Sequence, residues 1–107
     1  MADLWGALAQ SAPAATTLTA AYAVPSLRHA TVEVVICNRG SDATVRLSHA
    51  IGGASDSAAQ YLLYDLPIAA GESKATARFT AKAGDVIRVY ASSADVSFNV
   101  NGIEEDD

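Results

Sequence analysis

The chain has 107 residues and a formal net charge of −5 at pH 7; half of its residues are hydrophobic and 7% are aromatic. This length fits one small domain, and seven scattered Lys and Arg residues exclude the basic clusters that nucleic-acid binding requires. No apolar run approaches the roughly 20 residues of a membrane-spanning helix. The single cysteine, Cys37, excludes an intramolecular disulfide and is expected to be a small buried hydrophobic residue. We therefore expect neither a nucleic-acid nor a membrane partner.

Residues 1–15 show little periodicity and end shortly after Pro13, so we interpret them as an extended N-terminal arm. The arm contains three large apolar side chains, Leu4, Trp5 and Leu8. A tryptophan ring is costly to leave in water, so Trp5 either covers an open end of its own domain or is buried on another subunit. In the second case Leu4, Trp5 and Leu8 are the partner-binding residues of the arm.

Apolar and polar side chains alternate with period two along most of the chain after Thr16, which predicts β-strands. The stretch 30–38 is dense in β-branched residues and apolar on both faces after Glu33, so we expect it at the centre of a sheet. Residues 52–57 are rich in Gly and Ser and predict the longest loop. Further strands are expected at 16–24, 44–51, 61–67 and 74–81, with a final pair within 83–102.

About seven short strands separated by turn residues predict an all-β fold. We expect a single small antiparallel β-sandwich or jelly-roll-like barrel over residues 16–103. The acidic residues 104–107 are expected to form a disordered, solvated tail. On the strand that contains Ile87 and Val89, a slip of one residue would turn these side chains outward, so their inward orientation depends on register. The residues expected to be buried are Val32, Val34, Ile36, Val45, Leu47, Phe79, Ile87, Val89, Phe98 and Val100.

The two histidines, His29 and His49, are not framed by any metal-ligand spacing. His49 shares a strand face with Leu47 and Ile51, which indicates a hydrogen-bonded structural residue. The sequence contains no Gly-x-Ser-x-Gly nucleophile elbow and no glycine-rich loop leading into a helix. Asp85 follows a turn glycine, where an aspartate typically accepts local backbone N–H groups. We expect no catalytic residue, no metal and no cofactor, and we do not expect an enzyme.

Four stretches carry a resemblance to a known family: Val-Glu-Val-Val-Ile-Cys-Asn-Arg-Gly (32–40), Ala-Thr-Val-Arg-Leu-Ser (43–48), Tyr-Leu-Leu-Tyr-Asp-Leu-Pro-Ile (61–68) and Ala-Gly-Asp-Val-Ile-Arg-Val-Tyr-Ala-Ser (83–92). In this order they resemble small β-rich virion proteins of tailed bacteriophages, which include decoration, minor structural, and tail- or fibre-associated proteins. The resemblance covers about residues 11–103 and transfers no catalytic residue. It implies a non-enzymatic virion structural protein that is assembled in the host cytoplasm.

Within that class we expect a multi-copy head decoration or cement protein on the outer capsid surface, with the major capsid protein as its partner. A head-spike, tail, baseplate or fibre-associated protein is the alternative position in the virion. A core poor in large side chains and sheet edges that need covering also predict self-association, as a homotrimer or otherwise a dimer.

A host-surface carbohydrate-binding module is an alternative from a different class. Tyr61 and Tyr64 lie beside the loop 52–58 in the sequence and could contribute to an aromatic platform. Regular alternation would place these two side chains on opposite faces of one strand, so only one of them would join any single platform.

Overall fold

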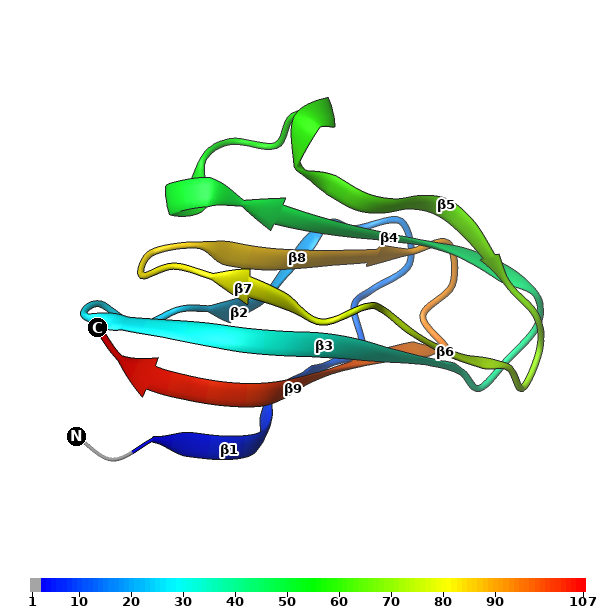
Figure 1. Ribbon diagram of the computed structural model, residues 1–107. Helices are drawn as coiled ribbons and strands as arrows, with labels where there is room; N and C mark the ends of the chain where they lie inside the picture. Colours follow the sequence, from blue (N-terminus) through cyan, green and yellow to red (C-terminus); the bar gives the residue numbers. More distant parts are fainter. Residues whose placement is uncertain (1–2) are drawn as a thin grey trace.

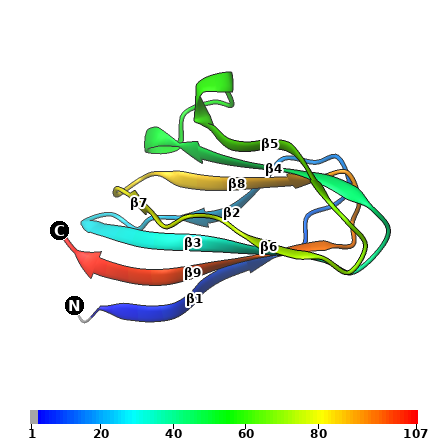
Figure 2. The same cartoon turned by 45° about the vertical axis from the view of Figure 1, so that its right-hand side comes forward.

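Two antiparallel sheets pack face to face in the computed structural model, which describes residues 3–107 (Figures 1 and 2). The predicted all-β sandwich is confirmed. Over the described residues the strands and 3₁₀ turns are β1 (Leu4–Ser11), β2 (Thr19–Ala23), β3 (Arg28–Asn38), β4 (Ala43–Ala50), η1 (Ile51–Gly53), η2 (Ala58–Gln60), β5 (Tyr61–Ile68), β6 (Ser73–Ala75), β7 (Phe79–Ala81), β8 (Val86–Ala91) and β9 (Val96–Asp106).

The first sheet has the order β1-β9-β3-β6, with β7 pairing with another part of β3. The second sheet has the order β2-β8-β4-β5. Every pairing is antiparallel, and β3 and β9 pair along their full lengths of 11 residues. Strand β1 is therefore one edge of the first sheet, while β5 is one edge of the second, as Figure 1 shows.

The core lies between the sheets and follows the predicted alternation. In β3 the side chains of Val32, Val34 and Ile36 are fully buried, and their neighbours in the strand are half-buried on the outer face. Of the ten residues predicted to be buried, nine are, and the register assumed for Ile87 is correct. Phe79 is half-buried and packs against the core cluster.

The single strand predicted at 74–81 is divided into β6 and β7. Thr76 lies at the break, where its hydroxyl accepts a hydrogen bond from the Val34 N–H at 3.0 Å. Its own N–H donates to the Val34 carbonyl at 3.0 Å. This exchange interrupts the regular ladder, so β6 pairs with residues 35–37 and β7 with residues 30–32 of β3.

The N-terminal segment differs from the predicted arm. Strand β1 pairs with β9 from Leu4↔Glu104 to Ser11↔Phe98, with a bulge between Ala7 and Ala9. The segment lacks β-branched residues, so its sequence gives little strand signal, and the β9 edge supplies the hydrogen-bond partners that make it a strand. Residues 1 and 2, which the prediction also included, lie outside the described residues.

The acidic C-terminal segment is not a disordered tail. Strand β9 continues to Asp106, and Glu104 is 5% exposed because it faces between the sheets. Two further side chains differ from expectation. Cys37 is half-buried on the outer face of β3, and Ile51 is 74% exposed because the strand gives way to η1 there.

Candidate functional site

Trp5 stands on the outer face of the first sheet, at the edge strand β1, and is 78% exposed. It lies opposite Ile103 of β9 and borders a hollow of about 200 Å³. Thr31, Glu33 and Arg78 line the same hollow, so polar and charged groups lie beside the indole ring. A large apolar side chain left this accessible is suited to burial on a partner.

The three residues predicted to bind a partner do not lie on one face of the sheet. Leu4 lies opposite Glu104 on the strand face that turns inward, although it is half exposed at the sheet edge. Leu8 lies at the bulge and packs against the core cluster. Adjacent side chains of a strand point to opposite faces, so only Trp5 of the three lies on the outer surface.

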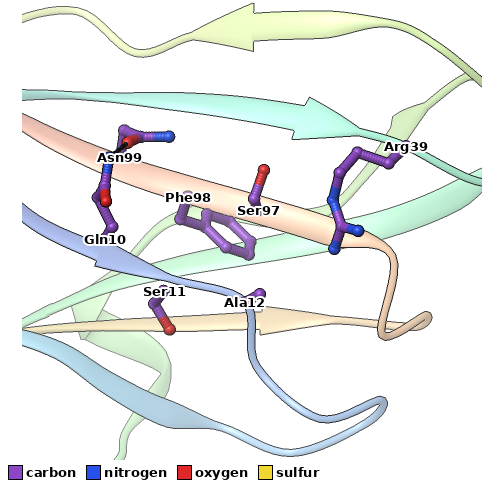
Figure 3. A pocket seen from close by; sticks show the side chains of 7 residues that line it. All are labelled: Gln10, Ser11, Ala12, Arg39, Ser97, Phe98 and Asn99. Carbon is purple, nitrogen blue, oxygen red and sulfur yellow. Dashed lines mark hydrogen bonds between the residues drawn. The ribbon is translucent and has the colours of Figure 1, made fainter.

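A second hollow, of about 540 Å³, lies where β1 ends beside β9 (Figure 3). Gln10 and Asn99 face each other across these strands, with a hydrogen bond of 2.7 Å from Gln10 Nε2 to Asn99 Oδ1. Arg39 lies at the other end and donates to the Ala94 carbonyl at 3.3 Å. The lining of this hollow contains amides, hydroxyls and one guanidinium, without a histidine or carboxylate to activate a nucleophile.

A third hollow, which we call the tyrosine cleft, lies on the second sheet beside η2 and has a volume of about 560 Å³. The rings of Tyr61 and Tyr64 meet edge to face, with centroids 5.0 Å apart and an interplanar angle of 89°. The Arg46 guanidinium lies 4.2 Å from the centroid of the Tyr64 ring and 4.4 Å from that of Tyr90. The lining residues of the cleft are Arg46, Asp56, Ser57, Ala58, Tyr61 and Tyr64.

The prediction that Tyr61 and Tyr64 point to opposite faces is wrong. The pairing of β4 with β5 shifts register twice, between Val45 and Leu47 and again between Leu47 and Ser48. Such bulges break the alternation of side chains, and they bring the two rings to one surface. Bulges depend on the neighbouring strand, so the sequence of β5 alone could not have indicated this convergence.

His49 and Asp85 form a structural pair between β4 and the turn before β8. His49 Nε2 lies 2.7 Å from Asp85 Oδ2, and the same carboxylate accepts the backbone N–H groups of Gly52 and Lys82 at 2.9 and 3.0 Å. Burial acts to raise the pKa of Asp85, but these hydrogen bonds outweigh it and hold the pKa below its ordinary value. The geometry agrees with the structural role expected for His49 and the turn role expected for Asp85.

His29 lies at the start of β3, beside the C-terminal end of β9. Its Nδ1 lies 2.8 Å from Asp107 Oδ1, and its Nε2 lies 3.6 Å from Glu105 Oε1. These groups are all partly exposed, and they fasten the end of β9 to the start of β3.

A buried polar cluster of Arg28, Glu104 and Tyr22 was not anticipated from the sequence. Arg28 Nε donates to Glu104 Oε1 at 3.1 Å, and the Tyr22 hydroxyl donates to Glu104 Oε2. Arg28 Nη1 also donates to Asp106 at 2.6 Å. Burial, and then the hydrogen bond with Glu104, raise the pKa of Tyr22 far above its ordinary value. The cluster joins β2 of one sheet to β3 and β9 of the other and serves stability.

Neither a protein-family model, nor a curated protein, nor a solved structure matches this chain. Among residues 3–107, no three or more His, Cys, Asp or Glu side chains are grouped to hold a metal ion. Within the same residues, no helix is long and apolar enough to cross a membrane. The exposed Trp5 and the tyrosine cleft are two surface features suited to binding a partner or a ligand.

Proposed function

We propose that this protein is a non-enzymatic structural protein of a tailed-bacteriophage virion. Within the virion, we assign it to the decoration or cement proteins that bind the outer capsid surface in many copies. The resemblance of its strand-and-turn motifs to small β-rich virion proteins supports this role. A net charge of −5 is also suitable for a protein that assembles near packaged DNA, because it disfavours adhesion to nucleic acid.

The observation that carries the proposal is the exposed Trp5 on the edge strand β1. Strand β1 has a bulge between Ala7 and Ala9 but contains no charged residue and no proline, two of the features with which proteins protect a sheet edge. Trp5 can be buried on a neighbouring protein while the backbone N–H and C=O groups of the β1 edge pair with the backbone of that protein. The major capsid protein is the partner we propose for this surface, and a second copy of the chain in a trimer or dimer is a further neighbour.

The contribution of Trp5 follows from its exposure. A tryptophan side chain buries up to about 200 Å² of mostly apolar surface, and 78% of the residue is accessible. At about 25 cal/mol per Å², full burial would contribute about 3–4 kcal/mol, which corresponds to a loss of affinity of at least about 100-fold when the ring is removed.

The test is binding of purified protein to phage heads that lack it, measured by co-sedimentation. Trp5→Ala should weaken binding at least about 100-fold while leaving the melting temperature nearly unchanged, because the ring contributes little to the core. Ile51→Ala is the matched control, since Ile51 is 74% exposed but lies on η1, which follows β4 of the other sheet. Wild-type affinity in the Trp5 variant, or no binding of the wild type to heads, would refute the proposal.

A further inference from the structure

Arg46 is held as a flat support on the outer face of the second sheet. Its guanidinium lies over the rings of both Tyr64 and Tyr90, at 4.2 and 4.4 Å from their centroids. It also donates to both carboxylate oxygens of Asp65, at 2.7 and 3.3 Å. A guanidinium with a bidentate carboxylate and two aromatic neighbours is fixed in place, and its charge is already balanced. Arg46 therefore orients the Tyr64 ring rather than serving as an open cation.

Tyr61 makes the second wall of the tyrosine cleft. Its ring is nearly perpendicular to that of Tyr64, so the two rings form an apolar corner. Tyr64 is 59% exposed, so its ring is accessible to a ligand. Asp56 and Ser57 line the same hollow and place a carboxylate and a hydroxyl beside the corner.

The loop that carries these polar groups is fastened at both ends. The Gly52 N–H donates to Asp85 at 2.9 Å, and Arg88 donates to the Gly53 carbonyl at 3.3 Å. At the other end, the Gln60 amide donates to the Ser55 carbonyl at 2.8 Å. Because these hydrogen bonds already order the loop, it loses little conformational entropy when a ligand binds.

We infer that the tyrosine cleft binds a neutral sugar ring, with the apolar face of the ring on Tyr64 and its hydroxyls on Asp56 and Ser57. A pyranose presents C–H groups on one face and hydroxyls around its edge, and the cleft presents an aromatic corner with a polar rim. The volume of about 560 Å³ lies within the range of small-molecule sites. The tyrosine cleft does not include Trp5. Its ligand, a glycan on the host or particle surface, would be bound in addition to the protein partners of the proposed structural role.

The charges favour a neutral ligand over an anionic one. Asp65 already neutralises Arg46, and Asp56 adds a further carboxylate to the cleft rim. A sugar acid or a phosphate group would therefore meet net negative charge. An extended proline-rich peptide, another partner of exposed tyrosines, needs a groove that continues past the rings. Here residues 56–58 line one side of a compact hollow, which favours a ring-shaped ligand.

The experiment is a titration of the ¹⁵N-labelled full chain, followed by amide chemical shifts. The probes are methyl glycosides of neutral hexoses and N-acetylhexosamines, the methyl glycoside of a hexuronic acid, and a proline-rich peptide. At least one neutral glycoside should give saturable shifts at residues 56–58, 61 and 64, with a dissociation constant of about 1–10 mM. Tyr64→Ala should weaken this binding at least about 10-fold.

Leu62→Ala is the matched control, because Leu62 is an exposed apolar residue of β5 that does not line the cleft. It should bind as the wild type does, and the spectra of both variants report whether the fold is retained. The inference is overturned if no neutral glycoside shifts these amides at about 10 mM. It is also overturned if the uronic acid or the peptide binds there in preference, or if Tyr64→Ala binds like the control.

Discussion

Glu104 gives the sharpest test of the buried polar cluster, because its neighbour Glu105 offers a matched control. Replacing Glu104 with Gln keeps the shape of the side chain and removes its charge. The residue is 5% exposed and accepts hydrogen bonds from Arg28 and Tyr22. The substitution leaves the Arg28 guanidinium, which is 2% exposed, without its closest buried carboxylate.

Breaking a buried ion pair costs about 3–5 kcal/mol. In Glu104→Gln, Arg28 keeps its bond to Asp106 at 2.6 Å and its bond to the backbone carbonyl of residue 104 at 2.9 Å. We therefore expect the lower end of that range, about 3 kcal/mol. The free energy of unfolding of such a domain is about 5–15 kcal/mol in total. For a domain of this size, a loss of about 3 kcal/mol would lower the melting temperature by about 12 °C or more.

The assay is guanidinium unfolding followed by circular dichroism, with thermal melting as a second readout. Glu105→Gln should change stability by no more than about 0.5 kcal/mol, because Glu105 is on the outer face and its contact with His29 is at 3.6 Å and exposed. Equal effects of the two substitutions would refute the reasoning, since a disordered C-terminal segment would make the two positions equivalent.

Two pH-dependent predictions follow from other buried groups. Because its pKa is raised, Tyr22 remains neutral in the folded state when the tyrosine of the unfolded chain begins to ionise near pH 10.0. The free energy of unfolding of the wild type should therefore fall above that pH by up to about 1.4 kcal/mol per pH unit. The stability of Tyr22→Phe should fall less steeply. Parallel alkaline profiles of the two proteins would contradict this. Asp85 has a lowered pKa, so its contribution is complete above its ordinary value of 3.8 and is lost as the pH falls through the folded-state pKa. Asp85→Asn should be less stable at neutral pH and show a flatter profile below pH 3.8, and an unchanged acid profile in urea unfolding would count against it.

Local alternation was enough to predict the core strands. Val34, Phe98 and Ile87 were placed inside because period-two patterns on β-branched and aromatic residues have one physical solution, a half-buried strand. The same rule explains why the prediction was wrong at the two chain ends, because those segments lack a clear period-two pattern. Strand β1 has few residues with strand preference, and only its pairing with β9 makes it a strand.

The missed site features are all non-local. Glu104 looked like part of a solvated acidic run, and only the partner Arg28, 76 residues earlier in the chain, shows why it is buried. Tyr61 and Tyr64 converge where the pairing of β5 with β4 shifts register twice, each time with an extra residue in β5. Neither relation leaves a signal within one segment of sequence, so the sequence indicated Trp5 and the two tyrosines as candidate surface residues but not the convergence of the tyrosine rings.

The central claim is that the protein is bound to a virion through strand β1. The most direct measurement is electron cryomicroscopy of intact phage particles from the host that carries the gene for this protein. The account predicts density for a two-sheet domain repeated on the outer capsid lattice, with the β1 edge and Trp5 against the shell. Particles without such density, or copies with β1 directed to solvent, would contradict it.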